Sequence, residues 1–290
     1  MGKVLLTGAK GFIGKNILLR LIEDGHNVVC KYKEDFNGLG YNDLDLSDID
    51  AVLHIGAISS TDADDPNELF SYNYAATKSL IDACKRDRPV NPPHFVFASS
   101  ASIYGNYDNL GGRNWYAWTK KCCEDYGWAV LGKNFTVLRY FNVYGPGESH
   151  KGSMASVAYQ AMKHQLGNHI SQFSLFKSPE DKPIKRDFVY IDDVVDATIH
   201  AMWHGSGGVH EVGTGEARSF EDVLDILEIP YKIPYTNEGL STGCPPKWYQ
   251  YHTESFEPTW MDGWKPKVSL EQGLAKYKEW FKQEHNESLG

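Results

Sequence analysis

Short apolar runs alternate with longer amphipathic segments through the first half of the chain. Five apolar runs predict buried strands, at residues 3–7, 26–31, 50–57, 94–100 and 135–141. Between them, apolar positions recur at helical spacing and predict helices at residues 11–25, 66–86 and 115–133. Strands that are apolar on both faces are typical of parallel sheets covered by helices on both sides. The order therefore predicts an α/β fold, a Rossmann-type doubly wound parallel sheet.

The second half of the chain has a less regular pattern. Further helices are expected at residues 152–166, 219–229 and 269–283, and a short strand followed by a helix at 185–204. Two of these helices begin with capping boxes, formed by Ser219 with Asp222 and by Ser269 with Gln272. Because no Pro-, Gly- or Ser-rich linker separates the halves, we expect a smaller C-terminal domain that is interleaved with the first.

Composition and charge exclude several classes of protein. The formal net charge of the 290 residues is −9, which disfavours a broad affinity for nucleic acid. No apolar run approaches the roughly 18 residues of a membrane span, and the N-terminus enters a strand pattern directly rather than a signal peptide. The five cysteines include one adjacent pair and no C-x-x-C spacing, which argues against a disulfide scaffold and against a zinc site. We therefore expect a cytoplasmic protein with no metal centre.

Gly8, Gly11 and Gly14 form a G-x-x-G-x-x-G pattern between the first predicted strand and the first predicted helix. Glycines in this context make a tight turn and bring backbone N–H groups at a helix N-terminus close to a pyrophosphate. The pattern predicts a dinucleotide-binding site. The strand at 26–31 then ends with Lys31, and Lys33 follows before any acidic residue. A cation at this point suits the 2′-phosphate of NADP, although Glu34 or Asp35 could still bind the ribose of NAD.

Tyr116 and Lys120 lie four residues apart on a predicted helix, and therefore on one face of it. A phenol, with a pKa of about 10, is a poor base at neutral pH, and a nearby ammonium is expected to lower that pKa. Ser100 ends the fourth predicted strand, at the sheet edge where ligands of open α/β folds bind. The three residues predict a catalytic group. Ser99 and Ser102 are interpreted as turn hydroxyls that bond the backbone.

In these features and in several further motifs, the chain resembles the extended short-chain dehydrogenase/reductase family, which contains nucleotide-sugar epimerases and dehydratases. The motifs are HIGA (54–57), ASSASIYG (98–105), RYFNVYGP (139–146) and RDFVYIDDV (186–194). Within it, the chain is similar to the family of ADP-L-glycero-D-manno-heptose 6-epimerases. The narrower motifs are GAISST (56–61), FNVYGPGESHKGSMAS (141–156), SLFKS (174–178) and GTGEARSF (213–220).

The resemblance implies roles for individual residues. Tyr116 and Lys151 would be two acid/base groups on opposite faces of the inverted sugar carbon, Ser100 would polarise its oxygen and Lys120 would hold the cofactor. The other implied cofactor contacts are Gly8, Gly11, Phe12, Ile13, Gly14, Lys31, Ala57, Asn73 and Val143. The implied substrate contacts are Asn142, Ser153, Phe176, Lys177, Ser178, Arg186 and Tyr249, with the guanidinium of Arg186 suited to a diphosphate. Gln160 stands where the family usually has a substrate-binding histidine.

The implied activity is inversion of one sugar carbon by transient oxidation and reduction with bound NADP or NAD. Another nucleotide-sugar 4-epimerase or a reductase stays open, as does an NADP-sensing module without turnover. A 4,6-dehydratase is disfavoured because Ala101 and Ser102 replace its acid pair. The expected partners are a nucleotide sugar and further copies of the chain, with neither nucleic acid nor membrane. The expected domains are a dinucleotide-binding part at 1–145 and 186–215 and a substrate part at 146–185 and 216–290.

Overall fold

Parallel strands form the main sheet of the protein, in the spatial order β2-β1-β3-β4-β5-β9. A computed structural model describes residues 2–35, 41, 43–60, 63, 65–105, 114–167, 172–175, 184–233 and 250–287. The strands of this sheet are β1 (Lys3–Thr7), β2 (Asn27–Lys31), β3 (Ala51–His54), β4 (His94–Ser100), β5 (Phe135–Tyr140) and β9 (Gly208–Val212). Because the chain leaves β1 first to one side and then to the other, the strand order reverses between β1 and β3, where α/β sheets open a crevice for ligands.

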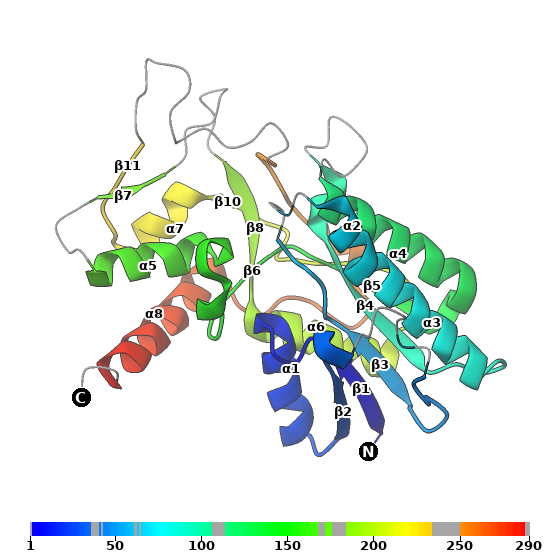
Figure 1. Cartoon of the computed structure of the whole chain (residues 1–290). Coiled ribbons are helices and arrows are strands. Elements are labelled where there is room, and N and C mark those ends of the chain that lie inside the picture. The colour runs from blue at the N-terminus through cyan, green and yellow to red at the C-terminus, as the bar shows by residue number, and fades with distance from the viewer. Residues whose placement is uncertain are drawn as a thin grey trace.

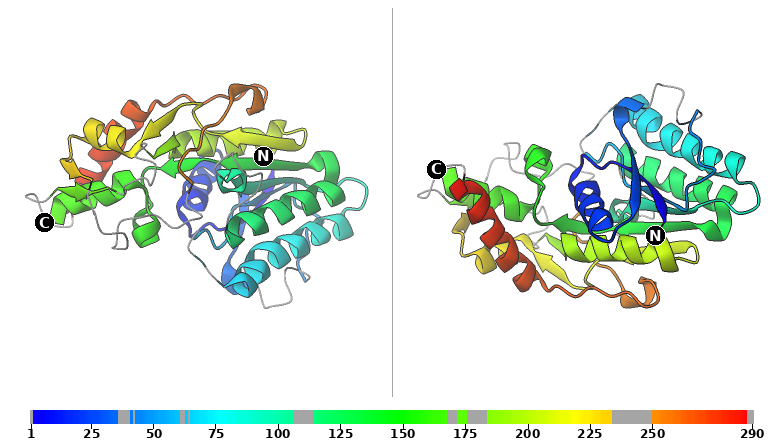
Figure 2. Two further views of the ribbon diagram at one scale, coloured as in Figure 1. Left: turned by 90° about the horizontal axis from the view of Figure 1, so that it is seen from above. Right: turned by 90° about the horizontal axis from the view of Figure 1, so that it is seen from below.

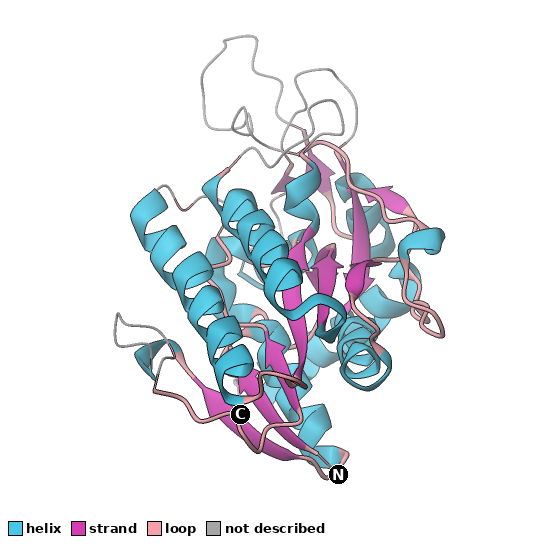
Figure 3. Cartoon of the chain, turned by 90° about the vertical axis from the view of Figure 1, so that its right-hand side faces the viewer, coloured by secondary structure: helices cyan, strands magenta, loops and turns pink. Residues whose placement is uncertain are grey.

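Helices cover both faces of the main sheet (Figure 2). On one face α1 (Phe12–Glu23) packs against α6 (Ile191–His204). The other face is covered by α3 (Ala76–Asp87) and α4 (Trp115–Leu131), which also pack against each other. Figure 3 shows the strands between these helical layers. The doubly wound α/β fold predicted from the sequence is confirmed.

The first strand shows how the apolar runs produce two cores. Val4 and Leu6 pack into a cluster with Ile17 of α1 and Val194 of α6, whereas Leu5 packs on the opposite face, in a cluster with residues of α3 and α4. Successive side chains of a strand point to opposite faces, so a strand between two helical layers has to be apolar at every position. These three β1 residues are at most 1% exposed.

A second group of elements lies beside the main sheet (Figure 1). Its strands are β6 (Asn142–Tyr144), β7 (Phe173–Ser174), β8 (Lys185–Tyr190), β10 (Ala217–Ser219) and β11 (Tyr231–Lys232), and its helices are α5 (Val157–Gly167), α7 (Phe220–Leu227) and α8 (Leu270–Glu287). Strand β8 pairs with β6 and β10, and β7 pairs with β11. Between β8 and β10 the chain returns to the main sheet through α6 and β9. The domain boundaries given above stay a prediction.

Two predicted helices differ from the observed elements. The helix expected at 66–86 consists of α2 (Pro66–Leu69), a π-helical turn η2 (Phe70–Ala75) and α3. The helix expected at 152–166 begins only at Val157, because Gly152 has a φ of 56° and interrupts the preceding 3₁₀ turn η5 (Ser149–Met154). The capping boxes at Ser219 and Ser269 are both present. The remaining 3₁₀ turns are η1 (Lys33–Asp35), η3 (Ala101–Tyr104), η4 (Gly132–Asn134) and η6 (Glu257–Thr259).

Within the described ranges, no helix combines the length and the apolar character that crossing a bilayer requires.

Candidate functional site

A cavity of about 1150 Å³ lies along the carboxyl edge of the main sheet. It is lined by the segments that follow β1, β2, β3, β4 and β5, together with η5 and parts of β8 and α7. Strand β1 and its neighbours β2 and β3 lie at the point where the strand order reverses. The cavity therefore occupies the crevice that the topology predicts for a ligand.

The glycine turn forms one end of this cavity. Gly8 has a φ of 77°, and a Cβ on it would lie 2.6 Å from the backbone nitrogen of Gly56, so the turn needs glycine at this point. A Cβ on Gly14 would lie 2.1 Å from the carbonyl oxygen of Gly8. Gly11 is the N-cap of α1, without a side-chain cap and with no acidic residue in the first turn. The helix N-terminus thus presents N–H groups to the cavity, and this donor set fits the diphosphate of a dinucleotide.

Basic side chains surround the cavity where β2 ends. Lys31 lines it and is half-buried, and no side-chain partner of Lys31 occurs among the described residues. Lys10, from the glycine turn, lies 4.4 Å from the ring centroid of Tyr32 and 3.4 Å from a carboxylate oxygen of Glu34. Glu34, the first acidic residue after β2, thus lies within ion-pair distance of Lys10. Lys10 and Lys31 thus place positive charge at this end of the cavity.

Tyr116 reaches the cavity from the first turn of α4, which Asn114 caps through its side chain. Tyr116 is buried, and burial raises the pKa of its phenol to about 12, while a hydrogen bond with Ser100 opposes the shift. Ser100 ends β4, and its Oγ accepts a hydrogen bond from the backbone N–H of Ser102 at 3.1 Å. The expected lowering of the tyrosine pKa is wrong for the protein alone, because desolvation of the phenolate outweighs the favourable contact.

Lys120 and Asn73 lie behind the wall of the cavity. The Nζ of Lys120 donates to the carbonyl of Ala98 at 2.7 Å and lies 5.8 Å from the ring centroid of Tyr116. Burial lowers the pKa of Lys120 to about 8. The carboxamide of Asn73 accepts from the N–H of Ile58 at 2.8 Å and donates to its carbonyl at 3.1 Å. In this structure both residues support wall segments of the cavity.

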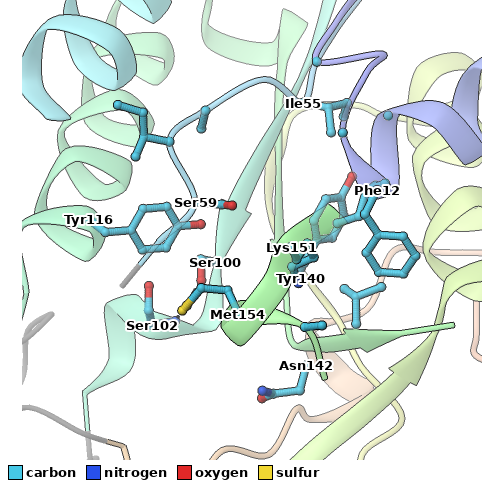
Figure 4. A pocket seen from close by; sticks show the side chains of 18 of the residues that line it. Phe12, Ile55, Ser59, Ser100, Ser102, Tyr116, Tyr140, Asn142, Lys151 and Met154 are labelled. Atoms are coloured by element: carbon cyan, nitrogen blue, oxygen red, sulfur yellow. Dashed lines mark hydrogen bonds between the residues drawn. The ribbon is translucent and has the colours of Figure 1, made fainter. Parts of the chain in front are cut away.

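Lys151 approaches the cavity from η5. Its Nζ lies 5.6 Å from the ring centroid of Phe12, at the start of the glycine-turn helix. Burial lowers the pKa of Lys151, and the carboxylate of Glu148 opposes the shift. Figure 4 shows Tyr116 on one side of the drawn pocket with Ser100 beside its hydroxyl, and Lys151 across from them near Phe12 and Tyr140. The two groups assigned from the resemblance thus share one cavity.

The other predicted residues fall into two sets. The cavity lining contains Gly8, Gly11, Phe12, Ile13, Gly14, Lys31, Ala57, Asn142, Val143, Ser153 and Arg186. Ser153 lies in η5 rather than at a helix start. Arg186 is buried and donates to the backbone carbonyls of Lys185, at 3.0 Å, and of Gln250. Phe176, Lys177, Ser178 and Tyr249 lie outside the described residues.

The two serines interpreted as turn hydroxyls differ from that expectation. Ser99 donates to Glu124 at 2.6 Å, so it is structural but bonds a side chain. The Oγ of Ser102 is covered and has no hydrogen-bond partner in the described part of the chain, although its residue lines the cavity. The interpretation of Ser102 is wrong in this respect, because its backbone N–H and not its hydroxyl makes the turn contact.

Sequence reasoning missed several residues at the cavity. Lys10 lies inside the glycine motif and could have been found there. Gln250 lines the cavity and donates to the carbonyls of Ala101 and Gly105 at 3.1 and 2.7 Å. These two bonds hold both ends of η3, although Gln250 lies at least 145 residues away in the sequence. No spacing rule indicates such a contact. Gln160, which replaces the usual histidine, donates to the carbonyl of Gly152 at 2.5 Å.

A buried ionic network lies behind Ser100 and Tyr116. Arg139 of β5 pairs with Glu124 of α4, with Nη2 and Oε2 2.6 Å apart. Arg139 also donates to the hydroxyl of Tyr104 at 2.9 Å, and that hydroxyl donates to Glu211 of β9 at 2.5 Å. The network connects α4, which carries Tyr116, to η3, which follows Ser100. It therefore holds the two elements on which these side chains depend in one arrangement.

The chain is similar in sequence to a known protein family and in fold to several solved structures. A family model described as the NAD dependent epimerase/dehydratase family matches residues 4–213. The structure of an ADP-L-glycero-D-manno-heptose-6-epimerase from Helicobacter pylori is 26% identical in sequence. The match covers 97% of this chain and 96% of the Helicobacter pylori chain, with a TM-score of 0.78. A UDP-glucose 4-epimerase from Thermotoga maritima, in complex with UDP-glucose, is 25% identical over 97% and 99% of the two chains (TM-score 0.77). The Thermus thermophilus UDP-glucose 4-epimerase in complex with NAD is 26% identical over 97% and 99% (TM-score 0.75).

Proposed function

Because the chain belongs to the NAD dependent epimerase/dehydratase family and is an NAD(P)-dependent enzyme of nucleotide-sugar metabolism, we propose that it inverts one sugar carbon. The observation that carries this proposal is the placement of Tyr116 and Lys151 on opposite sides of one cavity (Figure 4). An enzyme that only oxidises or only reduces needs one acid/base group at the reacting oxygen. Two groups suit a reaction in which the carbon is approached from both faces.

The dinucleotide, when bound, supplies the reversible oxidation of an alcohol carbon to a carbonyl, which removes the stereocentre. The protein moves the proton of the alcohol oxygen. Burial raises the pKa of Tyr116 to about 12 and lowers that of Lys151, so Tyr116 holds its proton at neutral pH and Lys151 gives its proton up more easily than an exposed lysine. These shifts favour Lys151 as the proton acceptor and Tyr116 as the donor on the opposite face. Ser100 would hydrogen-bond the same oxygen.

The proposed substrate is an ADP-glycero-manno-heptose or a close analogue. The run from His150 to Ser156 supports this choice, and so does the likeness to the Helicobacter pylori enzyme. Asn142 and Ser153 would contact the sugar, and Arg186 would contact the diphosphate. Phe176, Lys177, Ser178 and Tyr249 remain proposed contacts from the resemblance. A UDP-sugar 4-epimerase is the second candidate, because the two UDP-glucose 4-epimerases are as similar to this chain.

Incubation with a panel of ADP- and UDP-sugars, followed by NMR, tests the proposed function. We expect inversion at one sugar carbon, at C6 of an ADP-heptose, with no net change in the absorbance of reduced cofactor. Inversion at C4 of a UDP-sugar would select the second candidate. Stoichiometric consumption of cofactor, or the absence of inversion with every substrate, would contradict the proposal.

We further propose that the cofactor is NADP, held at its 2′-phosphate by Lys31. Mass spectrometry of the ligand released on denaturation should detect NADP. Lys31→Glu is expected to shift the ratio of bound NADP to NAD about tenfold toward NAD, the effect of about 1.4 kcal/mol from one lost charge contact. Lys33→Glu is the matched control and should shift the ratio less, since its Nζ lies 3.9 Å from the Tyr72 ring centroid and 3.5 Å from Glu68. Release of NAD alone from the unmodified protein would refute this assignment.

A further inference from the structure

Glu148 is a carboxylate with no exposed surface, three residues before Lys151. A buried carboxylate is costly unless hydrogen bonds compensate for its lost hydration. Its oxygens accept hydrogen bonds from the N–H of Gly145 at 3.4 Å, the N–H and Oγ of Ser156 at 2.6 Å each, and the hydroxyl of Tyr277 at 3.0 Å. Glu148 is thus fully engaged with groups of this chain.

These contacts join the two ends of the segment 145–156. Gly145 follows β6, and Ser156 immediately precedes α5, so a single carboxylate fixes both the beginning and the end of the segment. Tyr277 adds a third anchor from α8. Its hydroxyl reaches Glu148 from a helix near the end of the chain, 129 residues away in sequence.

Lys151 lies at the tip of this segment. Its backbone N–H donates to the carbonyl of Glu148 at 3.0 Å, which closes the turn that carries it. Its neighbours Ser149, His150, Gly152 and Ser153 are exposed and bury little surface that could hold the tip. Besides the hydrogen bond from Gln160 to the carbonyl of Gly152, the position of Lys151 in the cavity therefore depends on the base of the segment, where the carboxylate of Glu148 lies.

We propose that Glu148 is a positioning residue that holds Lys151 in the cavity opposite Tyr116, with Tyr277 as its support from α8. This inference rests on the proposed function, since it takes Lys151 as an acid/base group. A shift of about 1 Å in such a group can lower a rate by about two orders of magnitude.

Glu148→Gln tests the proposal with little change in volume, because the amide nitrogen cannot accept the bonds that the carboxylate accepts. We expect kcat for the nucleotide sugar inverted in the panel to fall about 10- to 100-fold, with KM changed less than about threefold. Hydrogen exchange at the amides of residues 148–156 should accelerate, a readout that needs no substrate. Tyr277→Phe removes one anchor and should lower kcat several-fold, which keeps the test available if Glu148→Gln does not fold.

A double-mutant cycle with Lys151→Met separates positioning from general destabilisation. If Glu148 acts through Lys151, the double variant is no slower than Lys151→Met alone. Asp193→Asn is the matched control: it too is a buried carboxylate that anchors a segment, through the N–H groups of Lys267 and Val268, and it should lower stability but leave kcat within about twofold.

The two proposals fail in different ways. Full activity of Lys151→Met would overturn the proposed two-group mechanism. An impaired Lys151→Met beside a fully active Glu148→Gln, or losses that multiply in the double variant, would overturn the role of Glu148 and leave the mechanism in place. If both Glu148→Gln and Tyr277→Phe keep the kcat and the hydrogen exchange of the unmodified protein, the segment is held by other contacts and the inference is wrong.

Discussion

Replacing Tyr116 by phenylalanine is expected to lower kcat by about two to four orders of magnitude, the usual contribution of a positioned acid/base group. The substitution removes the hydroxyl that bonds Ser100 and keeps the buried ring. Because the ring still packs at the start of α4, the protein should fold and retain its dinucleotide. Steady-state rates, together with the mass of the bound cofactor, measure both quantities.

Tyr126→Phe provides a matched control on the same helix. Its hydroxyl donates to Asp82 of α3 at 2.5 Å, so this variant also loses one tyrosine hydroxyl and one hydrogen bond, away from the cavity. We expect it to keep kcat within about threefold of the unmodified protein. Equal kinetics of Tyr116→Phe and Tyr126→Phe would show that the phenol of Tyr116 moves no proton in the rate-determining part of the reaction.

Arg139→Leu is expected to destabilise the protein by about 3–5 kcal/mol. The substitution leaves the nearly buried carboxylate of Glu124 without its cation and deprives the hydroxyl of Tyr104 of a donor. Urea denaturation of the folded protein, with the linear dependence of the unfolding free energy on denaturant, measures the loss. The effect should be larger than that of any exposed ion pair.

Arg218→Leu is the corresponding control at the surface. Arg218 lies 2.8 Å from Glu271 and 3.3 Å from Asp222, whose carboxylates are about half-exposed, so its removal should cost less than about 1 kcal/mol. Combining Arg139→Leu with Glu124→Leu should recover part of the loss, because it removes the unpaired charge as well. A loss below about 1 kcal/mol for Arg139→Leu would mean that the network contributes specificity without stability.

The sheet and its helices could be predicted because their signals are local. The run Val4-Leu5-Leu6 is apolar at every position because both faces of β1 are covered. The glycine motif predicts its own turn, because Gly14 packs against the carbonyl of Gly8 within the motif and leaves no room for a side chain. The helix interrupted at Gly152 could not be placed, because glycine alone does not reveal a positive φ. Helix boundaries there depend on what the segment packs against.

The sequence predicted most of the residues that line the candidate site, but it predicted their pKa values less well. The spacing of Tyr116 and Lys120 predicts a lowered pKa for the phenol, because the sequence shows that a positive charge is near. It does not show how deeply the two side chains are buried. In the folded protein burial has the larger effect on both groups. The contacts of Glu148 with Tyr277 and of Gln250 with η3 join residues more than a hundred positions apart. Neither has a local pattern from which it could be inferred.

The π-helical turn η2 has a consequence for how this protein tolerates insertions and deletions. Asn73 lies in that turn, where it bonds Ile58, and the carbonyl of Asn73 also accepts from the hydroxyl of Thr77 at 2.5 Å. Deleting one residue of the turn would restore a regular α-helix, and the helix itself would lose nothing. Because a π turn accommodates an extra residue within one turn, the flanking helices α2 and α3 would keep about the same phase, and the loss would fall on the turn that positions Asn73. A chain that is one residue shorter here would therefore have a more regular helix but would lose the contact of Asn73 with Ile58, which supports the cavity wall.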